Sequence, residues 1–516
     1  MSNTNSTETV LFIKPTRTIV VILLVVFLLL GVGVRLIDFT DLPLDFAATR
    51  QLHSLIMARG LYYQMDTPET NSMSQDYREF GIITGKSEPV IEPPVFENLV
   101  ALTYRLVGGE NILIPRVYSI LFWVIGGIPL FFLSRRLMTV NGAFAALAVY
   151  LFTPFGVFGS RSFQPDPMMV MWMIWALYYQ VKWAQEQKLG PAILAGIFTG
   201  IAIFIKGPAA FFVGIPLAGL VLSTGFKKWI KNKHVYLMAF LALLPALSFN
   251  IISATIGGNA GSIFGTRFFP ELFLDPKWYV KWLLMIKSVV NYFPLVIGLL
   301  AFFLIKTKQD RIFYFCLWLG YLLYGFMFAY HIYTHNYYHL PLIPILALGF
   351  GYGFSIVFEK LEEINRHWLA RVSMMVILIF SLGLCLLKIR GDLIASSYRH
   401  EAQYWTELGE KIGGNASVIA LTHDYGYRIS YWGHVNPKLW PTAGDRTIKT
   451  LVGATDPAFL QLFKELTTGK GYFLVTLIGE LDKQPDLKDY LFKSYPYQAG
   501  DGYYLFDLDH PLLQIN

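Results

Sequence analysis

The stretch RLIDFTDLPLDFAATRQLHSLIMARG, residues 35–60, follows the first long apolar run of the chain. It holds three aspartates, Asp38, Asp41 and Asp45. Carboxylates are poor membrane anchors, whereas a fixed carboxylate at the edge of a membrane cavity can act as a general base or orient a substrate. The stretch therefore predicts an active-site loop. The alternative is a solvated loop that carries aspartates only because it is exposed to water.

The composition indicates a polytopic membrane protein. Of the 516 residues, 54% are hydrophobic and only 15% are charged, whereas a soluble domain carries roughly 25% charged residues. Cys316 and Cys385 both lie in apolar runs, so the sequence predicts neither a disulfide framework nor a cysteine metal cluster. The net charge of +7 comes from Lys and Arg in short clusters between apolar runs, which is a topology signal and not that of a nucleic-acid partner.

Apolar segments approach the ~20 residues that a spanning helix needs, and about eleven spans are expected. They lie at 18–37, 115–134, 142–160, 167–184, 191–205, 208–224, 235–256, 284–305, 311–330, 339–358 and 371–388. The first run leads into Arg35 and Leu36 without a small-residue cleavage site, so we expect a retained first helix and not a cleaved signal.

Clusters of Lys and Arg predict which connections face the cytoplasm. The basic clusters alternate with poorly charged connections and include Arg135, Arg136, Lys227, Lys228, Lys306 and Lys308. The positive-inside rule then predicts a multi-pass protein of the plasma (inner) membrane with a cytoplasmic N-terminus. Ionisable residues gather at helix ends on the outer face, whereas a transporter should show them near the bilayer midplane.

Two regions outside the spans are expected on the non-cytoplasmic side. In the loop 38–114, apolar residues at helical spacing predict interfacial helices, and the polar residues 66–92 predict a mobile loop. After residue 390 the composition predicts a small soluble α/β domain. Its strands are expected at 416–422, 471–478 and 501–508, and its helices at 399–413, 457–467 and 485–493. The chain is thus divided into a membrane domain, 1–390, and a C-terminal domain, 391–516.

Several short motifs occur in order on the expected outer face. They are the spacing from Asp45 to Gly60, Glu92-Pro93-Pro94 followed by Arg105 and Gly108, Phe163 to Asp166, Lys206-Gly207-Pro208, and HNYYHLPLIP at 335–344. In these motifs the chain resembles the GT-C membrane glycosyltransferases, in particular the bacterial protein O-mannosyltransferase-like and aminoarabinose-transferase-like members. The resemblance extends to about residue 390.

The resemblance implies a polyprenyl-phosphate sugar as donor and an aspartate that opens the first outer loop as catalytic base. The family pattern places a glycine fifteen residues beyond this aspartate, which assigns the role to Asp45 because Gly60 stands there. Asp41 is the second candidate. Phe46 occupies the position where the family often has a second acidic residue, so the choice between the two aspartates stays open.

The residue types also fit transfer of a sugar from a phosphate. The acceptor nucleophile must lose a proton, for which a positioned carboxylate can contribute about 10²–10⁴-fold, and cations must stabilise the leaving phosphate. Lys206 and Arg161 are expected at outer helix ends and Arg267 in the outer loop 257–283, so these three are the predicted phosphate-binding residues. For Lys206 the alternative is a side chain that snorkels to the interface.

The predicted substrate-binding residues are Glu97, Asp166, His335, Tyr337, Tyr338 and His339. Asp166 could equally be a polar helix start between two prolines, and Glu97 an exposed face residue. His331, His335 and His339 would share one face of a helix and suggest a divalent cation. The neighbouring tyrosines favour instead an aromatic belt that grips a lipid headgroup. No metal ligand set and no cofactor is therefore assigned.

The sequence predicts an inverting glycosyltransferase that works on the outer face of the membrane. Its expected partners are a polyprenyl-phosphate sugar, membrane lipid and an acceptor that is a lipid, a glycan or a protein. The alternatives are a polytopic lipid or oligosaccharide transporter, and a non-catalytic scaffold whose C-terminal domain binds a partner. No glycine-rich nucleotide loop and no nucleic-acid signature is present in the sequence.

Overall fold

The computed structural model describes residues 16–255, 267–363, 367–414, 416–451, 453–454 and 457–512. Residues 257–266 of the predicted outer loop 257–283 lie outside the described residues. The chain forms two compact units. The first comprises Met1–Thr40, Val90–Phe96 and Leu113–Ser396, and the second comprises Asp41–Pro89, Glu97–Ile112 and Ser397–Asn516. This division differs from the predicted boundary at residue 390, because residues 41–89 and 97–112 cluster with the C-terminal residues.

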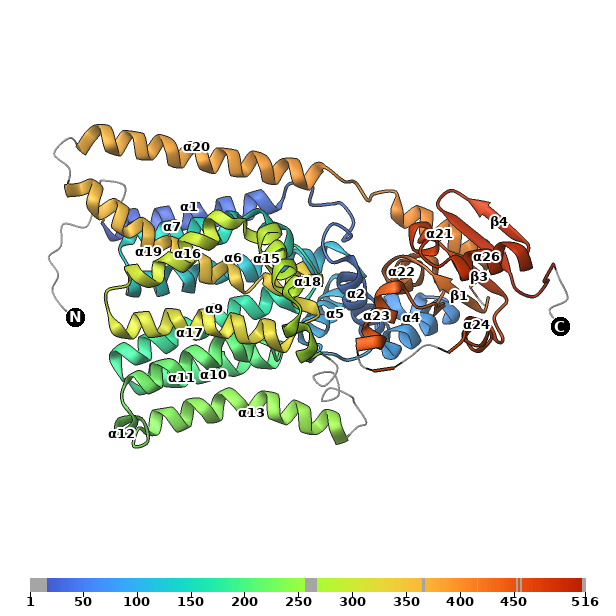
Figure 1. The fold of residues 1–516 in the computed structure, drawn as a ribbon, viewed down its shortest axis with the longest axis horizontal. Helices are drawn as coiled ribbons and strands as arrows, with labels where there is room; N and C mark the ends of the chain where they lie inside the picture. Colours follow the sequence, from blue (N-terminus) through green and yellow to red (C-terminus); the bar gives the residue numbers. More distant parts are fainter. Residues whose placement is uncertain are drawn as a thin grey trace. The chain divides into compact units, whose positions relative to one another are not determined.

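The first unit is helical, and helices occupy each predicted apolar segment (Figure 1). The long helices are α1 (Arg17–Arg35), α6 (Leu113–Leu137), α7 (Val140–Phe152), α9 (Pro165–Glu186), α10 (Leu189–Ile205), α11 (Ala209–Ser223), α13 (Lys233–Thr255), α15 (Pro276–Val290), α16 (Tyr292–Leu304), α17 (Lys308–Met327), α19 (Leu342–Glu363) and α20 (His367–Ile394). The short ones are α8 (Pro154–Gly159), α12 (Phe226–Trp229), η1 (Pro270–Leu274), α18 (His331–Thr334) and η2 (Asn336–His339).

Two of the predicted spans are interrupted. Among the described residues, five helices are long and apolar enough to cross a membrane, or six if the bent pair α15 and α16 counts as one span. That pair bends by 101° at Asn291, whose φ of 64° is left-handed. Residues 142–160 are divided at Pro154 into α7 and α8, because proline lacks the N–H that would continue the helix.

Close helix contacts hold the first unit together. Helix α10 packs against α9 and α13, α7 against α19, and α11 against α17. A Cβ on Gly320 of α17 would lie 2.2 Å from the carbonyl oxygen of Phe211 in α11. The absence of a side chain at Gly320 is therefore what allows these two helices to approach so closely.

The loop 38–114 contains more regular structure than its sequence indicates. It holds α2 (Ala48–Tyr63), α3 (Pro68–Ser72), α4 (Gln75–Ser87) and α5 (Val95–Val107). Residues 66–92 were predicted as a mobile loop, and the sequence did not indicate α3 and α4, which form there. Thr67 caps α3 in a reciprocal capping box with Thr70, and α4 packs against α2.

The contact between α2 and α4 depends on two glycines. A Cβ on Gly60 would lie 2.8 Å from the Cα of Gly85, a distance at which the backbone must shift. We expect Gly60→Ala to lower the free energy of unfolding by about 1–3 kcal/mol, as overpacking typically does. Gly109→Ala is the matched control, because nothing lies within 4 Å of a Cβ there. Thermal unfolding in detergent compares the two variants, and equal melting temperatures would contradict this account.

A five-stranded sheet lies in the C-terminal part of the second unit. Its strands are β1 (Val418–Leu421), β2 (Lys438–Leu439), β3 (Tyr472–Val475), β4 (Tyr497–Gly500) and β5 (Tyr503–Asp507), in the order β2-β1-β3-β5-β4. Strands β2, β1 and β3 are parallel, with Val418 opposite Tyr472, whereas β5 is antiparallel to β3 and β4. The predicted strands are present as β1, β3 and β5, and the sequence did not indicate β2 or β4.

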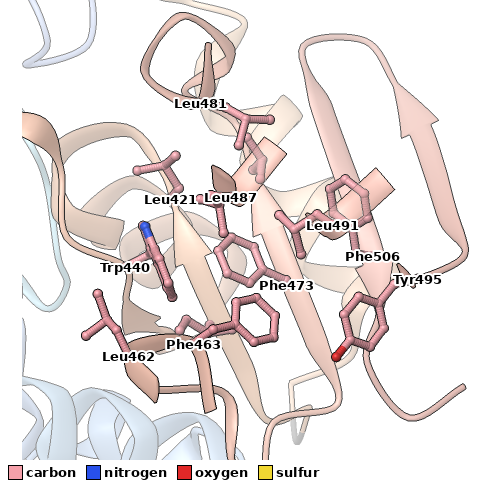
Figure 2. Close-up of a cluster of buried hydrophobic side chains, with 12 residues drawn as sticks. Leu421, Trp440, Leu462, Phe463, Phe473, Leu481, Leu487, Leu491, Tyr495 and Phe506 are labelled. Atoms are coloured by element: carbon pink, nitrogen blue, oxygen red, sulfur yellow. The ribbon is translucent and has the colours of Figure 1, made fainter. Parts of the chain in front are cut away.

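Helices surround this sheet: α21 (Glu401–Ile412), η3 (His423–Gly426), α22 (Tyr427–Gly433), α23 (Ala443–Leu451), α24 (Phe459–Thr467), α25 (Ile478–Leu481) and α26 (Pro485–Ser494). Alternate residues of β1 enter two different cores, as the period of a strand requires. Ile419 and Leu421 pack with the aromatic cluster around Trp440, Phe463 and Phe473 that Figure 2 shows. Val418 and Ala420 pack on the other face with Trp405 and Ile429.

Candidate functional site

A buried ion pair forms the centre of a polar cluster in the first unit. Lys206 directly follows α10, and the Gly207-Pro208 break separates it from α11. Asp166 lies in the first turn of α9 between two prolines, where a negative charge is favourable at a helix N-terminus. The Lys206 Nζ lies 2.9 and 2.7 Å from the two carboxylate oxygens of Asp166. Both side chains are buried, so neither is an exposed interfacial group.

Aromatic side chains and a second cation adjoin this pair. The ammonium of Lys206 lies 5.6 Å from the ring centroids of both Tyr337 and Tyr338. Tyr338 is buried and stacks on Tyr324 at 5.8 Å, and its hydroxyl accepts a hydrogen bond from Arg267 Nη1 at 3.2 Å. Lys206 thus contacts the Asp166 carboxylate and two tyrosine rings, and Arg267 contacts the second of these tyrosines. This arrangement suits a ligand with one negative charge and an apolar part.

The three histidines do not share one helical face. His335 has an extended backbone, φ −124° and ψ 107°, and separates α18 from η2. His335 lies 5.1 Å from the ring of His331 and 5.9 Å from that of Tyr338, between ring centroids. His339 is fully buried, and its Nδ1 and Nε2 lie 2.7 Å from the Tyr321 hydroxyl and the Ile332 carbonyl oxygen. Among the described residues, no group of three or more His, Cys, Asp and Glu could hold a metal ion.

Arg161 contacts a different segment of the first unit. Its guanidinium is buried, and Nη2 donates to the carbonyl oxygen of Asp38 at 2.8 Å. Arg35 reaches the adjacent residue, since its Nε donates to Ser160 Oγ at 2.6 Å. The structure therefore joins Asp166, Lys206, Arg267, Tyr337, Tyr338 and His335 through direct contacts, and places Arg161 against the end of the first helix and its loop.

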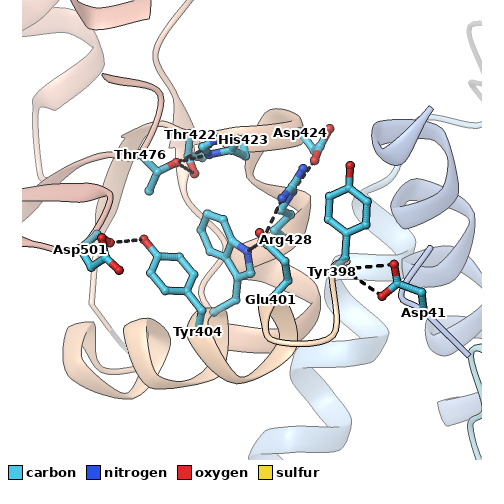
Figure 3. A network of polar contacts seen from close by, with 11 residues as sticks. Asp41, Tyr398, Glu401, Tyr404, Thr422, His423, Asp424, Arg428, Thr476 and Asp501 are labelled. Atoms are coloured by element: carbon cyan, nitrogen blue, oxygen red, sulfur yellow. Dashed lines mark hydrogen bonds and ion pairs between the residues drawn. The ribbon is translucent and has the colours of Figure 1, made fainter. Parts of the chain in front are cut away.

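The two candidate bases have different surroundings in the second unit. Asp41 is 2% exposed, and both of its carboxylate oxygens accept the backbone N–H of Tyr398, at 2.9 and 3.1 Å (Figure 3). Asp45 is partly exposed and precedes α2, whose N-cap Ala47 has a left-handed φ of 45°. Asp41 thus fixes the chain at Tyr398, whereas Asp45 keeps more access to solvent.

Glu97 and Glu110 are also fixed in the second unit. Glu97 is buried and accepts a hydrogen bond from Ser54 Oγ at 2.7 Å. The guanidinium of Arg59 pairs with Glu110 at 3.0 Å, donates to the Tyr431 carbonyl oxygen at 2.6 Å and lies over the ring of Tyr431. Burial by itself raises the pKa of Glu110, but the Arg59 charge outweighs burial and holds that pKa below its usual value. No sequence spacing could have indicated these contacts, because Arg59 is 51 residues from Glu110 and 372 residues from Tyr431.

The carboxyl group of Glu88 is the third in the second unit, and its pKa is raised toward neutral pH. Its carboxylate accepts a hydrogen bond from the Tyr427 hydroxyl at 2.9 Å and lies 3.5 Å from the Nε2 of His53. Burial raises the pKa of Glu88, and the hydrogen bond from Tyr427 offsets part of this effect, so that the pKa is about 7. Glu88 and Tyr427 therefore connect the segment before α5 to α22 within the second unit.

Solved structures share this fold. ArnT from Cupriavidus metallidurans bound to undecaprenyl phosphate matches with a TM-score of 0.57 and 14% identity, over 95% of this chain and 98% of that one. Its apo state matches with a TM-score of 0.58 and 12% identity, over 94% and 98%. The Archaeoglobus fulgidus oligosaccharyltransferase in the apo form matches with a TM-score of 0.56 and 12% identity, over 95% of this chain and 75% of that one.

The fold is therefore that of the GT-C membrane glycosyltransferases, and the resemblance found in the sequence motifs is confirmed. Residues 91–252 also match the family model described as dolichyl-phosphate-mannose-protein mannosyltransferase. That segment includes Glu97, Arg161, Asp166 and Lys206 of the predicted site. No curated protein sequence matches the chain.

Proposed function

We propose that this protein is an inverting GT-C glycosyltransferase that moves a sugar from a polyprenyl phosphate to an acceptor on the outer face of the membrane. The single observation that carries the proposal is the fold, since it is shared over nearly the whole chain with a protein solved in complex with undecaprenyl phosphate. The family-model match supports the same class of donor. The acceptor is a lipid, a glycan or a protein, and the transferred sugar a hexose or a pentose.

In the proposed reaction, an acceptor oxygen attacks the anomeric carbon while the bond from that carbon to the phosphate oxygen breaks. The acceptor proton passes to Asp45, with Asp41 as the second candidate. The negative charge on the leaving phosphate is stabilised by Lys206 and Arg267, with Arg161 as a third cation. Their paired contacts with Asp166 and Tyr338 favour this role, because they hold both cations in place before the phosphate arrives.

The proposed substrate contacts follow from the same cluster. The rings of Tyr337 and Tyr338 offer apolar faces to the first part of the lipid tail, and His335 adjoins them. Asp166 and Glu97 are proposed to orient the sugar or the acceptor. His339 directly follows Tyr338 in the sequence and is proposed to hold that segment in place, because its ring nitrogens already contact Tyr321 and the Ile332 carbonyl.

The donor distinguishes this function from its alternatives. We expect the purified protein in lipid nanodiscs to transfer sugar from a polyprenyl-phosphate sugar and not from a nucleotide sugar supplied in parallel. Release of polyprenyl phosphate and mass spectrometry of the glycosylated acceptor measure the reaction. Comparison of cell-envelope glycans with and without the protein identifies the acceptor. Transfer from the nucleotide sugar alone would contradict the proposed donor class.

We also propose that about eleven helices cross the plasma (inner) membrane, with a cytoplasmic N-terminus and with residues 391–516 outside. The distribution of Lys and Arg along the sequence supports this orientation. We expect a membrane-impermeant maleimide to label cysteines at Met73 and Lys470 in intact cells, and to label one at Lys306 only after permeabilisation. Cys316 is buried and Cys385 is half-buried, so the unmodified protein measures the background labelling. Labelling at Lys306 in intact cells would contradict the orientation.

A further inference from the structure

The second unit contains a cavity that the proposed transfer reaction does not use. Its volume is about 430 Å³, within the usual range for small-ligand sites. The polar side chains that line it include Glu401, Tyr404, His423, Arg428, Thr476 and Asp501. Figure 3 shows the contacts among them.

The topology of the sheet explains why a cavity forms there. The chain leaves β1 toward β2 on one side and leaves β3 toward β4 and β5 on the other, although β1 and β3 are parallel neighbours. In open α/β sheets, ligands bind outside the carboxyl ends of two strands whose connections diverge in this way. His423 follows β1 by two residues and Thr476 directly follows β3, so the cavity lies at this position.

The backbone beside the cavity is strained. Asp424 and Tyr425 are left-handed, with φ of 50° and 53°, and Gly426 follows with a φ of 78°. A bulky residue in this conformation is a genuine outlier, and such strain persists only where the surrounding structure holds it. Side-chain contacts hold the turn in this conformation, since Asp424 accepts hydrogen bonds from Thr49 Oγ1 at 2.9 Å and from Arg428 Nε at 2.5 Å. The strained turn thereby sets the direction of the Arg428 guanidinium.

The charges of the lining disfavour an anion. Arg428 is already paired with Glu401 at 2.9 Å and with Asp424, and Asp501 adds another carboxylate. His423 adds no positive charge at neutral pH, because burial lowers its pKa and the nearby Arg428 lowers it further. The lining instead combines the donors of Arg428 with the acceptors of Glu401 and the hydroxyls of Tyr404 and Thr476. Vicinal hydroxyl groups, each both donor and acceptor, match such a lining.

We propose that this cavity binds an uncharged sugar unit of a glycan. The inference deepens the proposed function, on which it rests for the source of the glycan, namely the acceptor. The sugar hydroxyls exchange hydrogen bonds with Glu401, Arg428 and His423. Trp405 also lines the cavity, and its indole N–H donates to Glu401 at 2.7 Å, which fixes the position of that carboxylate.

Saturation-transfer difference NMR on the full-length protein in nanodiscs tests this directly. The probes are methyl glycosides of mannose, glucose, galactose, N-acetylglucosamine and arabinose, with inorganic phosphate followed separately by ³¹P line broadening. We expect at least one glycoside to bind. Its affinity should fall at least about tenfold in Ile478→Trp, which places an indole at the cavity wall, and about fivefold in Glu401→Gln, the size of one lost hydrogen bond.

Leu460→Trp is the matched control, since Leu460 is 61% exposed on α24 and does not line the cavity. It should bind glycosides like the unmodified protein. Binding of none of the glycosides, binding of phosphate alone, or equal binding by Ile478→Trp and Leu460→Trp would each overturn the proposal. The measurement requires no donor and no turnover. Glycoside binding without transfer therefore contradicts only the proposed function, and transfer without glycoside binding contradicts only this inference.

Discussion

Asp45→Asn is expected to reduce sugar transfer at least about a hundredfold while the protein stays folded, because the amide keeps the shape of the side chain but cannot take up the acceptor proton. Asp45 is partly exposed, so the amide that replaces its carboxylate stays accessible to solvent. The measurement is the initial rate of transfer from a polyprenyl-phosphate sugar, with thermal unfolding recorded on the same preparation.

Asp41→Asn should behave differently. Its carboxylate accepts the Tyr398 N–H with both oxygens, and an amide can accept with only one. We expect a loss of about 1.5–3 kcal/mol in the free energy of unfolding, the range for a hydrogen bond to a charged group. Any loss of transfer should then follow the fraction of protein unfolded.

Asp38→Asn is the control for both variants. Asp38 has a left-handed φ of 48°, which asparagine tolerates, and its contact with Arg161 uses the backbone carbonyl. This variant should transfer sugar at the normal rate. A fully active Asp45→Asn beside an inactive but stably folded Asp41→Asn would move the catalytic role to Asp41, and full activity of both would refute a catalytic aspartate in this loop.

Lys206→Ala is expected to abolish transfer and also to destabilise the protein. Removing the cation leaves the buried carboxylate of Asp166 without its partner, which typically costs about 3–5 kcal/mol. A loss of activity in this variant alone therefore does not separate a phosphate-binding role from a structural one. The double variant Lys206→Met/Asp166→Asn removes both charges at similar volume and should recover most of the stability.

If Lys206 stabilises the leaving phosphate, the double variant regains stability but not turnover. Its affinity for polyprenyl phosphate should fall less than its rate, because the interaction strengthens as charge develops in the transition state. Donor binding by fluorescence anisotropy and the rate at saturating donor measure the two quantities. A double variant that transfers sugar at the normal rate would show that the pair serves only the fold.

The sequence by itself determined the apolar helices, the strands β1, β3 and β5, and the family resemblance. Hydrophobic runs of sufficient length must be helical in a membrane, because only a helix satisfies all backbone groups within the segment. The motifs around Asp45, Asp166 and Lys206 indicated the GT-C fold through their resemblance to that family.

Only the tertiary structure decided which side chains pair. Lys206 and Asp166 are 40 residues apart, and Asp41 and Tyr398 are 357 apart, so no periodicity connects them. Helix α4 was missed because its residues show no clear apolar period, and its contact with α2 depends on the close approach of Gly60 to Gly85. Strand β2 was missed because two exposed residues have no pattern and pair only where β1 already lies. A sequence specifies local conformation through propensity and burial, whereas long-range pairs form only after the chain has folded and brought distant residues within a few ångströms of each other.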